Sequence, residues 1–355
     1  MIRKINRIFQ DYMREKRLKF GKWLWDRKEN KQEIKSGNFI ENNNIKSILF
    51  LRYDGKIGDM VINTLMFREI KRRYPYIKIG VVAREGNAQI IKNNSNVDII
   101  YIYKKDRKEI VKLAEEISEE KYDLLIDFSE MLRVNQMMFI NKCTARFNMG
   151  LDKKDWKLFD ISYNKNNKLH ISKLYENILK ILGLKEINLE YDLKIPKEKE
   201  IETNYKYILL NPYAASKHRS LNIENIIKIG KKVLEHKELK LVLIGEKDKY
   251  EELDKISNFF DKNRIIIPKT KDILDVMAWI KKAEKIITPD TSIVHIAVAL
   301  KKPLIAIYRQ DLEKDNNSII WGPNSKIAKQ IFSRDVVKKG EESNINKFDI
   351  EEIEI

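Results

Sequence analysis

From Lys46 onward, short runs of β-branched and apolar residues alternate with segments in which apolar residues recur every three or four positions. This alternation is typical of parallel strands buried on both faces and of the helices that connect them. In the first half it predicts strands over Ser47–Tyr53, Lys78–Ala83, Ile99–Tyr103 and Leu124–Asp127, and helices that include Val61–Tyr74 and Ile171–Leu182. Residues 152–168 are polar and are expected to be irregular.

Residues 185–206 lose the pattern and are interpreted as a linker, after which strands and helices alternate again. The strands expected in the second half are Tyr207–Asn211, Leu241–Gly245, Arg264–Pro268, Lys285–Thr288 and Pro303–Tyr308. The pattern therefore predicts an α/β protein with two doubly wound domains. We expect an N-terminal extension over 1–45, a first domain over 46–184, the linker, and a second domain over 207–355.

Composition narrows the class of protein. The chain has 355 residues, of which 43% are hydrophobic and 35% charged, so a collagen-like or wholly disordered chain is excluded. One cysteine, Cys143, excludes a disulfide framework and a thiolate-rich zinc site, and it suits a reducing, cytoplasmic compartment. A net charge of +17 predicts attraction to nucleic acid, an anionic membrane or phosphorylated substrates, although a general abundance of lysine explains the excess equally well.

The N-terminal segment is basic and amphipathic. Residues 1–36 carry twelve Lys and Arg against five Asp and Glu. No run is long enough to span a membrane, and the segment lacks the apolar core of a secretory signal. Two interpretations are open: a helix on an anionic membrane surface, which we favour, or a helix packed on the protein itself. Its apolar positions at helical spacing are Ile5, Ile8, Phe9, Tyr12 and Met13, followed by Phe20, Trp23, Leu24 and Trp25.

The loop after the first strand contains a candidate catalytic carboxylate. Ligands of open α/β sheets bind at the carboxyl ends of the strands, so functional residues are expected in the loops that follow the strands. Residues 54–60, DGKIGDM, contain two glycines and Asp59 but match neither nucleotide-binding fingerprint. At the start of a helix, Asp59 could cap N–H groups, and such contacts would make it a stable anion and a weak base.

Three loops of the second half could bind an anion. Ser216, Lys217, His218 and Arg219 precede a helix, although a solvated basic loop is the alternative. Asp290, Thr291 and Ser292 open an apolar helix, and His295 lies one turn later, where a core histidine is the commoner outcome. Glu246 and Asp248, in the loop after strand Leu241–Gly245, could bind ribose hydroxyls or face water.

Taken together, these motifs resemble glycosyltransferase family 9, the ADP-heptose:lipopolysaccharide heptosyltransferases, over residues 46–335. The resemblance is carried in order by ILFLRYDGKIGDMVINTLMFREIKRRYP, VAREGNAQI, YDLLIDFSEMLR, LHISKLYENILKILGL, ILLNPYAASKHRS and ITPDTSIVHIAVALKKPLIAIY. It implies two facing Rossmann-like domains of GT-B type, with the acceptor on the first and the nucleotide sugar on the second. It also implies an inverting, metal-independent transfer of heptose from ADP-heptose to the lipopolysaccharide inner core, with no cofactor.

The resemblance assigns roles to individual residues. Asp59 corresponds to the catalytic base of the family. The donor-binding positions are Ser216, Lys217, Glu246, Asp290, Thr291, Ser292 and His295. The acidic lipid A–Kdo acceptor would meet basic residues at Lys104, Lys105, Arg107 and Arg133. A membrane-bound acceptor also gives residues 1–36 a purpose, and it implies a cytoplasmic enzyme at the periphery of the inner membrane.

Some positions depart from the family. Tyr213 replaces a glycine of Pro-Gly-Ala, Ser292 replaces a glycine, and residues 309–311 read RQD where Gly-Pro-Thr is usual. These changes surround the donor site, so a different nucleotide sugar or acceptor glycan is the main alternative. A basic nucleic-acid-binding protein or a scaffold is the other, although the sequence contains no nucleic-acid-binding motif and we expect no nucleic-acid partner.

Overall fold

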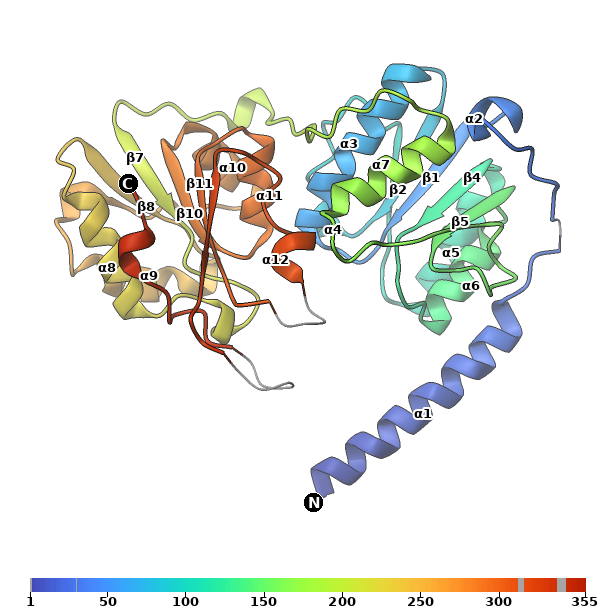
Figure 1. Ribbon diagram of the computed structural model, residues 1–355, viewed down its shortest axis with the longest axis horizontal. Coiled ribbons are helices and arrows are strands. Elements are labelled where there is room, and N and C mark those ends of the chain that lie inside the picture. The colour runs from blue at the N-terminus through green and yellow to red at the C-terminus, as the bar shows by residue number, and fades with distance from the viewer. Residues whose placement is uncertain (1, 30, 312–315, 337–342) are drawn as a thin grey trace.

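The structure is a computed structural model that describes residues 2–29, 31–311, 316–336 and 343–355. These residues form two lobes, each with a parallel six-stranded sheet and helices on both faces (Figure 1). The predicted α/β class with two doubly wound units is therefore confirmed.

The N-terminal sheet has the strand order β3-β2-β1-β4-β5-β6, with all neighbouring strands parallel. The chain builds outward from β1 on one side and then returns to place β4 on the other, so the strand order reverses between β1 and β4. Such a switch point opens a crevice at the carboxyl ends of the strands. The strands are β1 (Ser47–Arg52), β2 (Lys78–Ala83), β3 (Ile99–Ile102), β4 (Leu124–Asp127), β5 (Phe147–Leu151) and β6 (Ile161–Tyr163).

Helices cover both faces of this sheet. On one face α3 (Ile57–Arg73) and α7 (Ile171–Leu182) contribute to a core that also holds alternate residues of β1 and β2. On the other face α5 (Arg107–Glu119) and α6 (Val134–Lys142) form a second core with the remaining strand residues. Two short helices, α2 (Phe39–Asn42) and α4 (Glu85–Ala88), complete the lobe.

The C-terminal sheet has the order β12-β11-β10-β7-β8-β9, again with parallel neighbours. Its switch point lies between β7 and β10, so the loops that follow these two strands border its crevice. The strands are β7 (Lys206–Leu210), β8 (Leu239–Leu243), β9 (Ile265–Ile266), β10 (Lys285–Pro289), β11 (Leu304–Tyr308) and β12 (Ala328–Phe332).

The two lobes share one apolar core. In the C-terminal lobe α8 (Ile223–Leu234) and α9 (Tyr250–Ser257) cover one face, and α10 (Ile273–Lys282) and α11 (Ser292–Ala299) cover the other. Helix α11 packs on α3, so Met60 and Val294 belong to the same buried cluster. The remaining helices are α12 (Asn317–Ile320), η1 (Lys197–Lys199), η2 (Lys217–Arg219), η3 (Lys247–Lys249), η4 (Lys262–Arg264) and η5 (Ile350–Glu352).

The strand predictions were incomplete at the sheet edges. Residues 152–168, expected to be irregular, contain β6, and β5 and β12 were missed. These are edge or next-to-edge strands in which Asn, Gly, Lys and Gln interrupt the apolar run, so the periodic signal is weak. Helix α3 begins at Ile57, four residues before the predicted start, and this places Gly58 and Asp59 inside its first turn.

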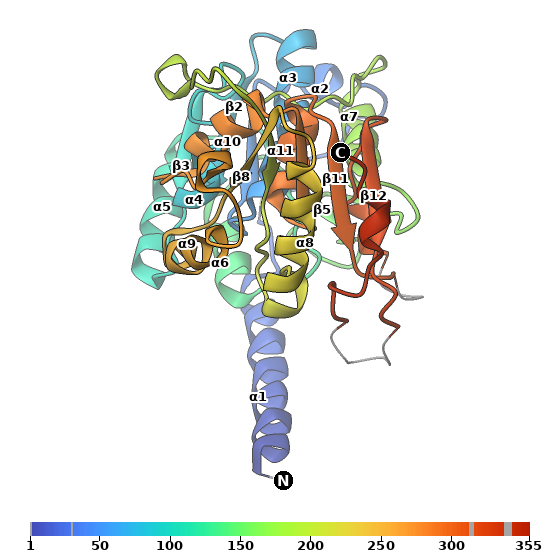
Figure 2. The same cartoon turned by 90° about the vertical axis from the view of Figure 1, so that its left-hand side faces the viewer.

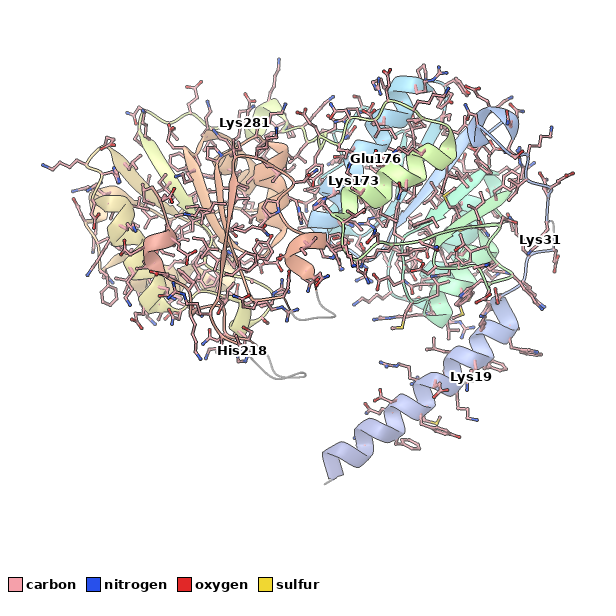
Figure 3. All side chains as sticks on the ribbon, in the orientation of Figure 1. Lys19, Lys31, Lys173, Glu176, His218 and Lys281 are labelled. Carbon is pink, nitrogen blue, oxygen red and sulfur yellow. The ribbon has the colours of Figure 1, made fainter. Side chains whose placement is uncertain are left out.

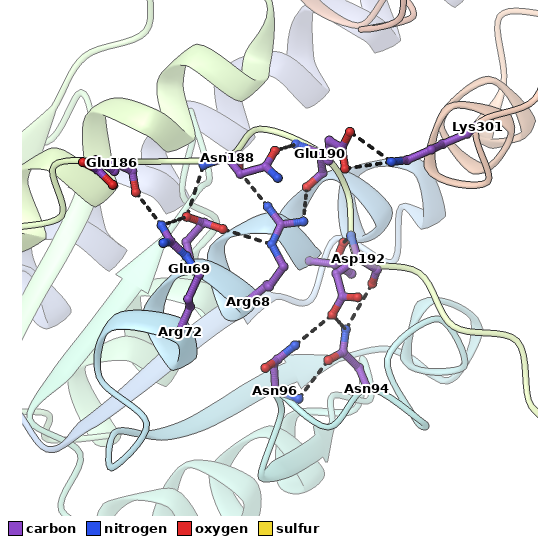
Figure 4. A network of polar contacts seen from close by, with 11 residues as sticks. Arg68, Glu69, Arg72, Asn94, Asn96, Glu186, Asn188, Glu190, Asp192 and Lys301 are labelled. Carbon is purple, nitrogen blue, oxygen red and sulfur yellow. Dashed lines mark hydrogen bonds and ion pairs between the residues drawn. The ribbon is translucent and has the colours of Figure 1, made fainter.

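The segment between the lobes is fastened to the N-terminal lobe. Figure 4 shows its first part, residues 186–192, lying along α3. The buried Glu69 carboxylate pairs with Arg68 and Arg72 and accepts the Asn188 N–H at 3.1 Å. Arg68 donates to the Asn188 and Glu190 carbonyls, each at 2.6 Å. Of the predicted linker, 185–206, this part therefore belongs structurally to the N-terminal lobe.

Helix α1 (Ile2–Trp25) extends away from the body, and only its C-terminal end contacts the N-terminal lobe (Figures 1 and 2). The side chains of Ile5 and Ile8, part of the predicted amphipathic stripe, lie outside the described ones. Among the described residues, none of the helices has the length and hydrophobicity needed to cross a membrane.

Candidate active site

A cleft of about 2600 Å³ lies between the lobes at the carboxyl ends of their strands. One wall is the first turn of α3, and the other consists of the loops that follow β7, β8 and β10. The structure thus gathers the predicted catalytic and donor-binding residues around one cavity, and their individual roles stay predictions. Those that line it are Asp59, Ser216, Lys217, Glu246, Asp290, Thr291, Ser292 and His295.

Asp59 is a nearly buried carboxylate held beside two cations. Its Oδ2 lies 3.2 Å from Nη2 of Arg52 and 3.8 Å from Nζ of Lys56. Burial raises the pKa of Asp59 above its ordinary value, while Arg52 and Lys56 oppose this rise and the charge of Asp54 adds to it. The expectation of a weakly basic capping group is therefore wrong in its direction, because burial makes this carboxylate more basic.

Arg52 is a site residue that the sequence analysis missed. It is the last residue of β1 and is 2% exposed, with its guanidinium 4.8 Å from the centre of the Phe128 ring. Its Nη1 lies 3.9 Å from Oδ2 of Asp54. An arginine that ends an apolar strand is expected to mark the point where the strand meets water. Here the carboxylates of Asp54, in the following loop, and Asp59, in the first turn of α3, pair with it instead.

The two walls touch at Gly58. A Cβ at this position would lie 2.7 Å from Cδ2 of His295 and 3.5 Å from Cα of Ser292, so a larger residue would force the lobes apart. The residue next to the predicted base is therefore in direct contact with two predicted donor-binding residues.

His295 is a buried, neutral imidazole on the donor side of this contact. Burial and, to a smaller extent, the charge of the neighbouring His170 together lower its pKa to about 3. Its Nδ1 has no hydrogen-bond partner among the described residues. Buried polar atoms are usually paired, so this atom suits a ligand in the cleft better than a core role.

The start of α11 is built as an anion-binding terminus. Thr291 caps the helix, since its Oγ1 accepts the Ile293 N–H at 3.3 Å. Asn211, at the end of β7, donates to Thr288 at 2.9 Å and to Thr291 at 3.4 Å. These bonds join both strands of the switch point. They hold the helix N-terminus, with its partial positive charge, toward the cleft.

The carboxylate of Asp290 is paired with an arginine. This carboxylate forms an ion pair with Arg219, which also donates to the Asp290 carbonyl at 3.1 Å. Burial raises the pKa of Asp290 above its ordinary value, although the positive charge of Arg219 opposes this rise. The carboxylate therefore positions a second cation at the cleft beside Lys217. Arg219 was noted in the sequence as part of a basic loop, but its partner could not be read from spacing.

The remaining donor-side residues are more exposed. Lys217 opens η2, and the Ser216 carbonyl accepts the Arg219 N–H at 3.1 Å. Glu246 directly precedes η3 and is exposed at the cleft. Both acidic and basic groups therefore reach the same cavity from different loops.

Tyr213 joins two of these loops. A Cβ at Gly245 would lie 3.0 Å from Cε2 of its ring, and Nζ of Lys249 lies 5.3 Å from the ring centre. The ring therefore packs the loop after β7 against the loop that carries Glu246. The aromatic side chain of Tyr213 therefore narrows this part of the cleft.

The predicted acceptor residues are spread along the edge of the N-terminal sheet. Lys104, Lys105 and Arg107 follow β3, and Lys104 pairs with Glu109 at 3.8 Å. Arg133 follows β4, where its N–H donates to Gln136 at 2.8 Å. Strands β2 and β1 separate the two groups, and none of these four described residues lines the cleft.

Arg84 adds a basic residue between these groups that was not predicted. It follows β2, and a Cβ at Gly55 would lie 2.8 Å from its Cδ. Burial raises the pKa of Tyr103 to about 12, and the charges of Arg84 and Arg133 oppose the rise. Both guanidinium groups therefore lie near the Tyr103 hydroxyl, among the residues predicted to bind the acceptor.

The described residues hold no group of three or more His, Cys, Asp or Glu side chains that could hold a metal ion.

Known proteins share this architecture along almost the whole chain. A crystal structure of a glycosyltransferase family 9 protein from Veillonella parvula aligns with a TM-score of 0.74 at 16% identity, covering 86% of this chain and 94% of that one. The Escherichia coli heptosyltransferase WaaC with ADP aligns with a TM-score of 0.67 at 15% identity, covering 85% and 96%. At these identities the likeness establishes the fold.

Sequence comparison establishes the family. The chain is 24% identical over 341 residues to the Escherichia coli K12 protein named "Putative lipopolysaccharide heptosyltransferase 4", covering 91% of this chain and 89% of that protein. A family model described as glycosyltransferase family 9 (heptosyltransferase) matches residues 110–344. Because that match spans more than half of its residues, the chain belongs to glycosyltransferase family 9, the heptosyltransferase family.

Proposed function

We propose that this glycosyltransferase transfers heptose from ADP-heptose to a hydroxyl of the lipopolysaccharide inner core, with inversion and without a metal ion. Family membership supports heptosyl transfer, and the bound ADP named for WaaC supports an adenine nucleotide. In this proposal residues 46–184 bind the acceptor and residues 207–355 bind the nucleotide sugar.

The observation that carries the proposal is the contact at Gly58. It places Asp59 in the same cleft as the N-terminus of α11 and His295. A base on one wall and an anion-binding terminus on the other are the two parts that displacement of a diphosphate requires.

The reaction is a single displacement. As the acceptor hydroxyl attacks the anomeric carbon, its proton passes to the Asp59 carboxylate. A carbon–oxygen bond forms on one face of the sugar while the bond to the diphosphate oxygen breaks on the other. The electron pair leaves with ADP. The raised pKa of Asp59 favours proton uptake at this step, provided that the carboxylate is ionised beforehand.

The donor side would stabilise the leaving diphosphate. The N–H groups at Thr291 and Ser292 and the ammonium of Lys217 would meet the phosphate oxygens. Arg219, held by Asp290, adds positive charge nearby. The unpaired Nδ1 of His295 would bind a polar group of the donor, and Glu246 and Ser216 would contact the ribose and its phosphate.

The acceptor is proposed to be an acidic lipid A–Kdo glycolipid. Lys104, Lys105, Arg107 and Arg133 provide positive charge along the acceptor edge of the N-terminal sheet. Residues 1–36 would bind the anionic surface in which this acceptor lies, and the enzyme would work at the cytoplasmic face of the inner membrane. The exposed aromatic residues of α1 support this location.

Tyr213 supports a second candidate, in which the same mechanism uses another nucleotide sugar. Its ring fills space beside Glu246 that a glycine would leave open. The pocket for the ribose and base could thus differ in shape from that of the relatives.

Calorimetric titration with ADP, UDP, GDP and ADP-heptose, without added metal, tests both candidates. We expect selective binding of the adenine nucleotides that is weakened by Lys217→Ala and unchanged by Lys228→Ala, a lysine on the exposed side of α8. Preference for UDP or GDP would retain the fold and replace the donor. Failure of all four to bind would contradict a nucleotide-sugar transferase.

A further inference from the structure

Helix α1 has an apolar stripe that is largely exposed to solvent. Phe9, Tyr12, Met13, Phe20 and Trp23 are 61%, 54%, 40%, 63% and 75% exposed. At 100° per residue, these five positions fall within an arc of about 100° along one side of the helix. Exposed apolar residues scattered singly are ordinary, but several large apolar side chains on one side of a helix mark an interaction surface.

The opposite side of α1 is docked on the protein. Leu18 and Trp25 pack against the core beneath α5 and α6, and Gly21 is buried between them. A Cβ at Gly21 would lie 2.6 Å from Cγ2 of Val134, so the close approach of α1 to α6 requires glycine. The docking face, Leu18, Gly21 and Trp25, therefore leaves the apolar stripe directed away from the body.

Polar contacts continue the docking beyond the end of the helix. Asn141 donates to the carbonyls of Trp25 at 3.3 Å and Arg27 at 2.8 Å. Asp26 accepts the Leu158 N–H at 2.9 Å. Nζ of Lys28 forms a nearly buried ion pair with Asp160. Several independent contacts thus fix the direction in which α1 leaves the lobe.

That direction is toward the acceptor side. Val134 is the first residue of α6 and directly follows Arg133 at the carboxyl end of β4, so α1 passes the carboxyl edge of the N-terminal sheet. Residues 2–17 then extend about 24 Å beyond this contact. Figure 3 labels Lys19 on α1, at the start of the docked part of the helix.

The chemistry of the arm favours a lipid surface over a protein partner. Residues 1–36 carry twelve basic against five acidic residues. Lys16 lies within the apolar stripe, with its Nζ 5.4 Å from the centre of the Tyr12 ring, and Lys19 lies at the border of the stripe. Aromatic rings flanked by lysine and arginine suit the headgroup region of an anionic bilayer, where the rings enter the interface and the cations meet phosphate.

We infer that α1 is a rigid membrane arm. Its apolar stripe binds an anionic phospholipid surface, and its docking face, through Gly21, holds the acceptor edge of the N-terminal sheet toward that surface. The inference rests on the proposed function for the meaning of this orientation, but membrane binding and orientation are measured without any glycosyl transfer.

The first test measures binding to sedimented phosphatidylglycerol–phosphatidylcholine vesicles. We expect the full chain to bind these vesicles and to bind phosphatidylcholine alone poorly. The exposed double variant F20S/W23S should bind about tenfold or more weakly, with its melting temperature unchanged. Equal binding by the variant would overturn the inference. So would a stripe-dependent change in molar mass in solution, because that result would identify a second copy as the occupant.

The second test measures orientation. Cys143 is the only cysteine and is buried, so a label can be placed at M131C on the loop after β4 or at Y76C near the opposite edge of the same sheet. On vesicles containing a headgroup quencher, the label at 131 should be quenched several-fold more than the label at 76. Equal quenching would overturn the rigid arm.

Gly21 provides the matched perturbation. G21L should bind vesicles as well as the parent chain but lose the difference in quenching, because α1 can no longer dock on Val134. In the double variant G21A/V134A, the smaller side chain at 134 makes room for the new Cβ, so much of the difference in quenching should return. Retention of full orientation by G21L would contradict the docking role. ADP titration of the same samples separates the two proposals. Nucleotide binding without vesicle binding would reject only the membrane arm. Vesicle binding without nucleotide binding would reject only the proposed transferase.

Discussion

The two walls of the cleft are built in opposite ways. The N-terminal wall presents one carboxylate, Asp59, inside a helix, nearly buried and supported from beneath by Arg52. The C-terminal wall presents several side chains on loops, and Lys217 and Glu246 are exposed. Groups that react must be held in place, whereas groups that bind a large, charged substrate can adjust as it enters. Changes on the first wall should therefore alter the rate, and changes on the second should alter affinity.

Replacing Asp59 should give the largest difference between an effect on the rate and an effect on affinity. In D59N the base is lost while the volume is preserved, so the transfer rate should fall by about 10²–10⁴-fold. The affinity for ADP, measured by calorimetry, should stay near that of the parent enzyme. D54N, in the same loop, is the control and should retain most of the rate. A D59N enzyme with normal turnover would refute the assignment of the base.

Replacing Arg52 should shift the pH dependence of the transfer rate. Transfer requires ionised Asp59, so the rate rises with pH through the pKa of this group. Because Arg52 holds that pKa down against burial, R52M should raise it and displace the rise in rate to higher pH. Loss of one partner of a buried pair should also lower the free energy of unfolding by about 3 kcal/mol.

The more exposed Lys56 gives the comparison for that experiment. K56M should shift the pH–rate profile in the same direction but less, since the Lys56 ammonium is farther from Asp59 and faces solvent. Profiles that coincide for all three proteins would show that Arg52 does not tune the base.

Adding one methyl group at Gly58 should disturb both walls together. In G58A the new Cβ meets the His295 ring, so the lobes must separate slightly, and the rate should drop by about tenfold. G86A is the matched control, because a Cβ there meets nothing within 4 Å. Steady-state kinetics of both variants at saturating donor would reveal the difference, and equal rates would mean that the contact has no part in catalysis.

The smallest effect is expected at Tyr213. Y213G should leave the rate nearly intact but change the ratio of affinities for ADP, UDP and GDP by a few-fold, because the ring shapes the pocket beside Glu246. Y213F keeps the ring and should behave as the parent enzyme in the same titrations. An unchanged ratio in Y213G would assign the residue to packing alone.

How far the sequence predicts this molecule depends on the kind of signal. Apolar runs such as residues 47–53 report buried central strands directly, and both sheets followed from them. Strand β6 has only three residues and lies within a polar segment, and β12 includes Lys and Gln. Both strands form because they pair with the adjacent strand of the sheet, which no local sequence pattern reveals.

The candidate site divides in the same manner. Motif positions such as Asp59 and His295 could be selected because they follow strands at the switch points. Arg52 could not, because its burial depends on Asp54 and Asp59 folding back over the strand end. The pairing of Arg219 with Asp290 joins residues 71 positions apart, so only the tertiary structure reveals it.

The segment 186–192, which lies along α3 beside Glu69, also affects how the two lobes can be exchanged between related proteins. Residues 186–192 donate the Asn188 N–H to the buried Glu69 carboxylate and offer backbone carbonyls to Arg68 and Arg72. In a chimaera joined at residue 185, these contacts would form only if the other parent's backbone followed the same path along α3. A junction after Asp192, before η1, keeps the set intact. Recombination that preserves activity should therefore exchange the lobes at a junction after Asp192, inside the connection, rather than at the end of α7.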